Sequence, residues 1–226
     1  MGAAMSNRAG IGMTSGRTRA RMIERLREQG IRDEIVLEAM HAVPRHLFVD
    51  EALASRAYDD SPLPIGHGQT ISQPWVVARM TELARAGKGL NSVLEIGTGC
   101  GYQTAVLARI AKKVWSVERI GALVAKARRC LQSLKITNVA LKHGDGSRDL
   151  DEALQVDAIV ITAGTTHVPD ALFAYLSTGG RMVLPLARSD DERGTQRLTV
   201  VTLTPSGAKQ QMLDAVRFVP LLPGLA

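Results

Sequence analysis

The sequence predicts an α/β protein with a doubly wound, mostly parallel sheet, an N-terminal helical lobe and a C-terminal antiparallel hairpin. First, a short apolar run at residues 92–96 leads directly into a glycine cluster and then a helical pattern. Second, strand-like and helical stretches alternate as far as residue 186, as in sheets whose parallel strands are joined by helical crossovers. Third, two strand-like stretches at 197–203 and 210–218 flank a short turn, which predicts a hairpin at the sheet edge.

The N-terminal part is expected to be helical. Residues 1–16 show no apolar period and are expected to form a flexible arm. Arg17 to Gln29 predicts a basic amphipathic helix whose arginines form a solvated face, with nucleic-acid binding as the alternative. Asp33 is a plausible N-cap for a second helix that runs through His41 and is stopped by Pro44.

Residues 58–74 contain several prolines and glycines, so they form neither a regular helix nor a central strand. Their position before the core, and their polar side chains, predict either an active-site loop or a plain linker. Pro74 then begins a helix that extends to about Ala84. We therefore divide the chain into the arm, a helical lobe with the loop at 17–88, and a nucleoside-binding domain at 89–226.

The core is predicted as an alternation of strands and helices. The expected strands are 92–96, 113–117, 139–143, 156–162 and 180–186, and the expected helices are 102–111, 120–134 and 169–176. The polar stretch Ser189–Gly194 is expected to be a mobile loop.

Composition is that of an ordinary globular protein. Of 226 residues, 45% are hydrophobic and 22% charged, and no stretch is apolar and long enough for a transmembrane helix. Aromatic residues make up only 4%, which argues against a surface that stacks nucleic-acid bases. Cys100 and Cys130 have no zinc-like spacing, and two lone thiols suit a reducing compartment, so we expect a cytoplasmic protein without a metal.

The glycine cluster Gly97, Gly99 and Gly101 predicts a nucleoside-binding turn. Glycine lets the backbone approach a ligand closely, and Glu118 at the end of the next predicted strand can accept hydrogen bonds from ribose hydroxyls. A dinucleotide fingerprint would place a small residue at 102, where Tyr102 stands, so a nicotinamide oxidoreductase is disfavoured.

Further candidates follow from the rule that ligands bind beyond the carboxyl ends of parallel strands. Asp145 could accept the exocyclic amine of adenine with the Gly146 N–H beside it, although Gly-Asp-Gly is more often only a turn. Thr162 stands at the end of the fourth predicted strand.

The chain resembles the bacterial protein-L-isoaspartate O-methyltransferases, which have a Rossmann-like methyltransferase fold. Glu95-Ile-Gly-Thr-Gly99 resembles a motif shared by many S-adenosylmethionine-dependent methyltransferases. The more specific matches are Gly68-Gln-Thr-Ile-Ser-Gln-Pro74 and Val216-Arg-Phe-Val-Pro-Leu221. Weaker matches include Val43-Pro-Arg45, Gly101-Tyr-Gln-Thr-Ala105 and His143-Gly-Asp-Gly146.

The resemblance implies repair of damaged proteins by transfer of a methyl group from S-adenosylmethionine to the free α-carboxylate of L-isoaspartyl residues. It makes Ser72 the active-site residue, and it implies that Ser72, Val219 and Pro220 contact the substrate. The residues expected around the cofactor are Thr70, Ile71, Gln73, Glu95, Gly97, Thr98, Gly99, Tyr102, Glu118, Arg119, Asp145, Gly146 and Thr162. The expected partners are isoaspartyl proteins and peptides, not nucleic acid or a membrane, and the expected state is a monomer.

Three departures from the family pattern stand out. Cys100 replaces a frequent serine, and residues 147–149 and 163–169 differ from the usual versions. Alternatives remain open at this point: an O-methyltransferase for another small carboxylate or hydroxyl substrate, a nucleic-acid methyltransferase, and a non-catalytic binding protein. Thr162-Ala-Gly-Thr165 lacks the Pro-Pro-aromatic tetrapeptide of base amino-methyltransferases, which counts against the second.

Overall fold

A computed structural model describes residues 10–148, 150, 153–187 and 195–226. The expected mobile loop at Ser189–Gly194 and most of the expected arm lie outside the described residues. Within the arm, Gly12–Thr14 form the 3₁₀ helix η1. No helix in the described ranges is both long enough and apolar enough to span a membrane.

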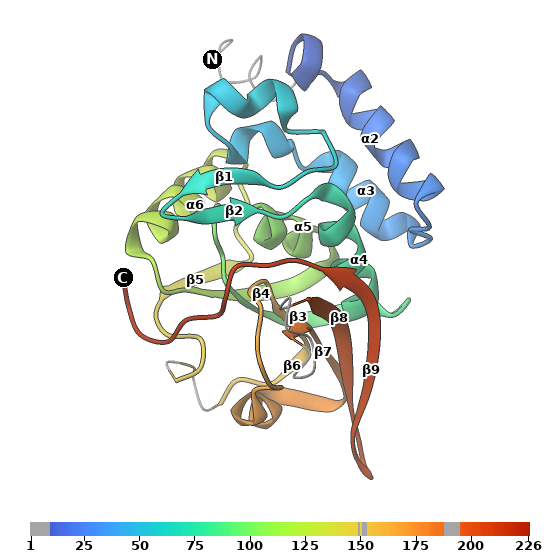
Figure 1. Ribbon diagram of the computed structural model, residues 1–226, viewed down its shortest axis with the longest axis vertical. Coiled ribbons are helices and arrows are strands. Elements are labelled where there is room, and N and C mark those ends of the chain that lie inside the picture. The colour runs from blue at the N-terminus through green and yellow to red at the C-terminus, as the bar shows by residue number, and fades with distance from the viewer. Residues whose placement is uncertain (1–9, 149, 151–152, 188–194) are drawn as a thin grey trace.

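The central sheet of the described chain has seven strands in the order β5-β4-β3-β6-β7-β8-β9 (Figure 1). Their bounds are β3 Leu90–Ile96, β4 Ala111–Glu118, β5 Val139–His143, β6 Val156–Ile161, β7 Leu176–Ala187, β8 Gln196–Thr204 and β9 Gly207–Val216. The strands β3 to β7 pair in parallel, whereas β8 and β9 are antiparallel to their neighbours. The mostly parallel sheet and the C-terminal hairpin are therefore confirmed.

Two layers of helices stand on one face of this sheet (Figure 1). The inner layer is α4 Pro74–Arg85, α5 Tyr102–Ile110 and α6 Gly121–Ser133, and the outer layer is α2 Gly16–Glu28 and α3 Glu34–Ala42. Local signals set their beginnings: Asp33 accepts a hydrogen bond from the Ile35 N–H, and Pro74 is the first residue of α4. The division at residue 88 stays a prediction, and α4, on the lobe side of it, packs directly against β6, β7 and β8.

The opposite face is covered differently from the expectation. Residues 169–176 were expected to form an α-helix, but Asp170–Tyr175 form the 3₁₀ helix η4. Only six residues separate Pro169 from the first residue of β7, Leu176, so the segment has no room for a longer helix. It still supplies an apolar cover, because Leu172 packs in a buried cluster with Ile159 and Met182 from the sheet.

The stretch before α4 forms more regular structure than its composition indicates. Residues 45–48 and 51–56 are the 3₁₀ helices η2 and η3, and β1 Leu63–Gly66 pairs with β2 Gln69–Ile71 as a small separate hairpin. This hairpin was not predicted from the sequence. His67 and Gly68 at its tip both have positive φ, of 55° and 68°, as a two-residue hairpin turn requires.

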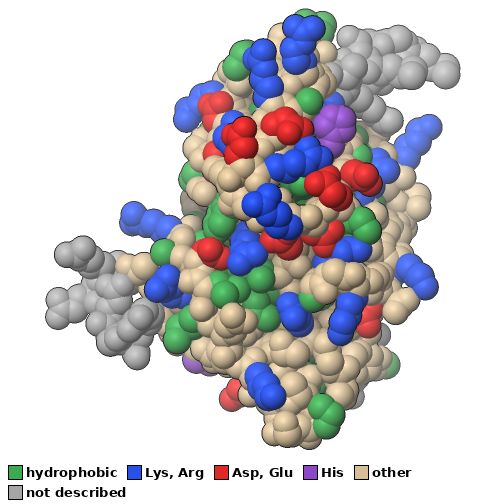
Figure 2. All heavy atoms as spheres, turned by 90° about the vertical axis from the view of Figure 1, so that its right-hand side faces the viewer, with side chains coloured by type: hydrophobic (Ala, Val, Ile, Leu, Met, Phe, Trp, Pro, Cys, Tyr) green, Lys and Arg blue, Asp and Glu red, His purple; other side chains and the backbone are tan. Residues whose placement is uncertain are grey.

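The arginines of α2 are only partly a solvated face. Arg17 and Arg21 are exposed as expected. Arg19 instead donates to the carbonyl of His41, and Arg25 donates to the carbonyl of Tyr58 over 2.6 Å, so these two fasten α2 to the lobe. Figure 2 shows basic and acidic side chains interspersed over this side of the molecule, and ion pairs such as Arg27–Glu34 at 2.7 Å join them.

The last ten residues cross the carboxyl ends of the parallel strands (Figure 1). Residue 164 holds the first half of this tail, since its N–H donates to Val219 and its carbonyl accepts from Leu221, each over 2.8 Å. Further along, the Ala226 N–H donates to the carbonyl of Arg119. The tail therefore forms a wall over the end of the sheet where a ligand is expected.

Candidate active site

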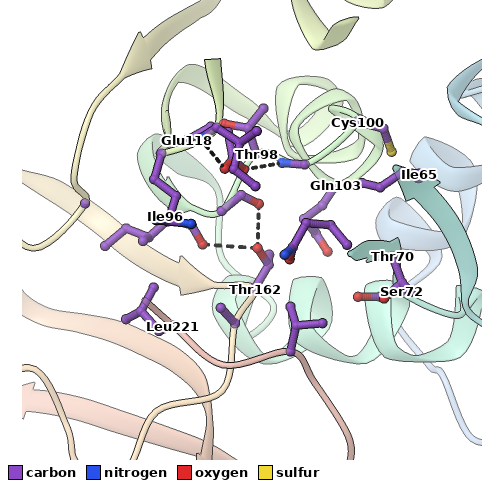
Figure 3. Close-up of a pocket in the computed structure, with 18 of the residues that line it drawn as sticks. Ile65, Thr70, Ser72, Ile96, Thr98, Cys100, Gln103, Glu118, Thr162 and Leu221 are labelled. Carbon is purple, nitrogen blue, oxygen red and sulfur yellow. Dashed lines mark hydrogen bonds between the residues drawn. The ribbon is translucent and has the colours of Figure 1, made fainter. Parts of the chain in front are cut away.

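A cavity lies at the carboxyl ends of β3, β4 and β6, between the sheet, the β1–β2 hairpin and the C-terminal tail. It encloses about 880 Å³, including the part that is open to solvent. Figure 3 shows Thr70 and Ser72 facing it from the hairpin side and Thr162 and Glu118 facing it from the strand ends. Its position confirms the expected end of the sheet.

The glycines of the turn after β3 are required by their surroundings. Gly97 has a φ of 96°, and a Cβ there would lie 2.3 Å from Oγ1 of Thr162. On the other side of β3, a Cβ on Gly146 would lie 2.5 Å from Cγ2 of Ile96. The backbone at both positions therefore comes close to its neighbours and leaves the space in front of it open.

Glu118 is the only acidic side chain that lines the cavity in the described part of the chain, and it is 6% exposed. Oε2 accepts from the Gly99 N–H over 2.8 Å, and Oε1 accepts from the Ile120 N–H over 3.0 Å (Figure 3). These two bonds fix the carboxylate, and each oxygen keeps a second lone pair that can accept from a ribose hydroxyl.

Glu95 lies behind the glycine turn and does not line the cavity. Its side chain is fully buried, and Oε2 accepts from the hydroxyls of Thr104 and Ser116, each over 2.5 Å. The Ser116 hydroxyl is in turn 2.6 Å from that of Thr98, which does line the cavity. Burial raises the pKa of Glu95 to about 8, and the negative charge of the nearby Glu118 raises it as well. The two hydrogen bonds from the hydroxyls of Ser116 and Thr104 act in the opposite direction and lower it.

Asp145 also points away from the cavity. One carboxylate oxygen accepts from the N–H and the hydroxyl of Ser147, and the other accepts from the Gly224 N–H over 2.8 Å. These bonds, the one from Gly224 first, lower the pKa of Asp145. The carboxylate thus fastens the C-terminal tail, while the neighbouring Gly146 lines the cavity.

Tyr102 lines the cavity, but its ring belongs to the core of the lobe. The ring is 1% exposed, packs edge-on against Phe48 and lies 4.8 Å from the guanidinium carbon of Arg45. Burial raises the pKa of its phenol. Tyr102 therefore joins the start of α5 to the helical lobe.

A second hollow of about 920 Å³ adjoins the cavity on the outer side of Ser72. We call it the outer groove; it is lined by Pro62, Thr70, Ser72, Gln73, Trp75, Val76, Thr162 and residues 215–219. Thr70, Ser72, Thr162 and Val219 line both spaces, so they form the boundary between them.

Most predicted site residues meet at these two spaces. The cavity is lined by Thr70, Ile71, Ser72, Gly97, Thr98, Gly99, Tyr102, Glu118, Arg119, Gly146, Thr162, Val219 and Pro220. Gln73 lines only the outer groove, and Glu95 and Asp145 line neither. Several lining residues were not predicted from the sequence, among them Ile65, Val77, Gln103, Leu221 and Leu222. The motif Gly101-Tyr-Gln-Thr-Ala105 contained a signal for Gln103, whereas only the path of the tail reveals Leu222.

A family model described as protein-L-isoaspartate(D-aspartate) O-methyltransferase matches residues 17–225. The chain belongs to this family. A protein-L-isoaspartate O-methyltransferase of Nitrosomonas eutropha is 57% identical over 218 residues, which are 96% of this chain and 96% of that one. Another, from Dechloromonas aromatica, is 58% identical over 95% of this chain and 98% of that one.

Solved structures confirm the fold. The structure of a protein-L-isoaspartate O-methyltransferase has a TM-score of 0.80 at 28% identity, and the match covers 92% of this chain and 67% of that one. A Plasmodium falciparum protein is described as a protein-L-isoaspartate O-methyltransferase in complex with S-adenosyl-L-homocysteine. Its structure has a TM-score of 0.75 at 26% identity, and the match covers 90% of this chain and 98% of that one. The expectations of a methyltransferase fold and of S-adenosylmethionine as the cofactor are confirmed.

The cavity fits this cofactor chemically. The close backbone at Gly97 leaves room for a ligand, and the Glu118 carboxylate suits the ribose. Arg119 is the only other charged side chain that lines the cavity among the described residues. A large cavity with few charges suits a nucleoside with apolar and polar parts.

Proposed function

We propose that this enzyme transfers a methyl group from S-adenosylmethionine to the free α-carboxylate of L-isoaspartyl residues in damaged proteins and peptides. The observation that carries the proposal is the position of Ser72 on the boundary between the two spaces. The cavity would hold the methyl donor and the outer groove would hold the peptide, so donor and acceptor would meet at Ser72.

The reaction needs alignment more than proton transfer. A sulfonium methyl group is already activated, and a carboxylate is already an anion near neutral pH, so no general base is required. The lining of the outer groove agrees, because Arg217 is its only charged side chain within the described ranges. Holding oxygen and methyl carbon in line can lower the barrier by about 7–11 kcal/mol at best.

Ser72 is proposed to orient the substrate carboxylate. Its hydroxyl makes no hydrogen bond to another described residue, and it follows directly after β2, whose pairing with β1 fixes the backbone. Thr70 and Ile71 before it would hold the cofactor, whereas Gln73, which was expected at the cofactor, lines only the outer groove and would face the peptide. Val219, which lines both spaces, would contact the substrate from the opposite wall, where the tail is fixed by residue 164. Pro220 lines only the cavity, so it would contact the substrate carboxylate from the side of the methyl donor.

The alternative is methyl transfer to another small carboxylate or hydroxyl compound. The outer groove favours a peptide, since it continues along the backbone of residues 215–219 beyond Ser72 and includes Trp75 and Phe218. A small substrate would need only the boundary itself.

Two peptides that differ only in one L-isoaspartyl against one L-aspartyl linkage test the proposal with methyl-labelled S-adenosylmethionine. We expect base-labile label on the isoaspartyl peptide alone. The ester then forms a succinimide without the enzyme, and hydrolysis returns some normal aspartate. No label on either peptide, with S-adenosylhomocysteine still bound in a calorimetric titration, would overturn the repair function and leave the small-substrate alternative.

The same proposal includes a monomeric, cytoplasmic protein without a nucleic-acid partner. Its supports are the unpaired thiols Cys100 and Cys130 and the interspersed charges of α2 (Figure 2). Light scattering during size-exclusion chromatography tests the monomer, and a dimer mass would contradict it.

A further inference from the structure

A buried amide lies in the cavity wall on the first turn of α5. Gln103 is 8% exposed and lines the cavity, although it has no part in the proposed alignment of the methyl group and the carboxylate (Figure 3). It faces Thr81 of α4, so it lies where the helical lobe meets the cofactor domain.

The neighbouring hydroxyl fixes the orientation of this amide. Thr81 Oγ1 donates its single hydrogen to the carbonyl of Val77 over 2.7 Å. It can therefore only accept from the Gln103 atom 2.9 Å away, which must be the donor Nε2. Oε1 is then the free end of the amide, and no described residue donates to it.

Oε1 is accessible from the cavity that Gln103 lines, so a ligand that supplies a donor there would gain a hydrogen bond to an acceptor that no described residue uses. Both charged side chains that line the cavity in the described part of the chain, Glu118 and Arg119, stand at the end of β4 and its following turn. The methionyl part of the cofactor carries an ammonium and a carboxylate. Free N–H groups at the start of α5 suit the carboxylate, whereas the ammonium needs an acceptor.

We propose that Oε1 of Gln103 accepts a hydrogen bond from the α-ammonium of the methionyl part and so positions the cofactor. Thr81 is a positioning residue that acts through Gln103, because it holds the amide in the accepting orientation. This inference deepens the proposed function because its ligand is the methyl donor of that reaction, and it concerns binding, not transfer.

The test is a calorimetric titration with two ligands, S-adenosylhomocysteine and an analogue in which hydrogen replaces the α-amino group. Gln103→Met keeps the size of the side chain and removes the acceptor. We expect Gln103→Met to bind S-adenosylhomocysteine about tenfold or more weakly than the unmodified protein does. Its affinity for the analogue should stay within about twofold of that of the unmodified protein. Gln103→Glu places a negative charge beside the ammonium, and we expect it to retain or increase the affinity for S-adenosylhomocysteine.

Two results would overturn the proposal. If Gln103→Met lowers the affinities for both ligands equally, the residue only shapes the cavity. If Gln103→Glu markedly lowers the affinity for S-adenosylhomocysteine, the carboxylate of the methionyl part lies at this position. If a thermal melt shows that Gln103→Met does not fold, Thr81→Val takes its place in the titration. We expect Thr81→Val to lower the affinity for S-adenosylhomocysteine by a smaller factor and to leave the affinity for the analogue unchanged. Unchanged affinity for both ligands, or lower affinity for both, would contradict the proposal. Failure of the peptide methylation assay would leave these affinities unchanged, so the two proposals fail separately.

Discussion

The N–H of Gly99 donates a 2.8 Å hydrogen bond to Oε2 of Glu118, so the glycine turn after β3 and the carboxylate at the end of β4 form one unit. The two residues are adjacent because β3 and β4 pair in parallel with Ile96 opposite Val117. This hydrogen bond therefore supports both the turn that lines the cavity and the carboxylate that we expect to bind the ribose.

Glu118→Ala is expected to lower the affinity for S-adenosylhomocysteine by roughly tenfold to a hundredfold. The substitution removes a charged hydrogen-bond acceptor worth about 1.5–3 kcal/mol and leaves the Gly99 N–H without its acceptor. Calorimetric titration measures the loss. Glu51→Ala on the exposed helix η3 is the control and should bind normally. Equal affinities for the two variants would remove Glu118 from the cofactor site.

Ser72→Ala is expected to lower turnover of the isoaspartyl peptide roughly tenfold to a hundredfold, since one hydrogen bond to a carboxylate is worth about 1.5–3 kcal/mol. Folding and affinity for S-adenosylhomocysteine should remain, because Ser72 bonds to no other described residue. Ser206→Ala in the distant turn between β8 and β9 is the matched control. Unchanged turnover in Ser72→Ala would exclude the hydroxyl from the reaction.

Gly97→Ala is expected to destabilise the protein by more than about 1 kcal/mol, because the new Cβ would meet Oγ1 of Thr162 at 2.3 Å and φ is positive. Gly179→Ala separates the two causes. Its φ is 82°, but no neighbouring atom lies within 4 Å of the added Cβ. The loss of stability in Gly179→Ala therefore comes only from the positive φ. Urea unfolding of both variants gives the difference, and a smaller loss at Gly97 than at Gly179 would contradict the close approach.

Glu95 is expected to make stability fall as pH rises. Its pKa is raised to about 8 from an ordinary 4.5, so between these values the folded protein holds a proton that the unfolded chain has released. Each pH unit in this window costs at most about 1.4 kcal/mol. In Glu95→Gln this slope should be absent, so the variant should gain stability relative to the original protein from pH 5 to 8. Parallel urea curves at both pH values would contradict a buried titrating carboxylate.

Cys100 is expected to react slowly with N-ethylmaleimide. Burial raises its pKa to about 11, so only about one molecule in a thousand carries the thiolate at pH 8. Because Cys100 lines the cavity, S-adenosylhomocysteine should slow the reaction further, whereas Cys130 lies outside the cavity and should be unaffected by the ligand. Peptide mass spectrometry measures both rates, and equal protection of both thiols would contradict the assignment.

The sequence by itself determined the order of elements and the cofactor class. Apolar period, caps and glycines act over a few residues, so they located α2 to α6, the parallel strands and the turn at Gly97 with its partner Glu118. The motif around Ser72 was also visible, since the resemblance depends on contiguous residues.

Only the tertiary structure decided which way the polar side chains point. Glu95 belongs to the motif, but strand alternation turns it into the core behind the turn, and Asp145 turns to the tail because the Gly224 N–H reaches it. Leu222 became a cavity residue through the path of the tail, and the Gln103 amide is oriented by Thr81 of α4, which is far from it in the chain. Such contacts arise when α4 and the tail pack on the sheet, and no local pattern of residues records that packing.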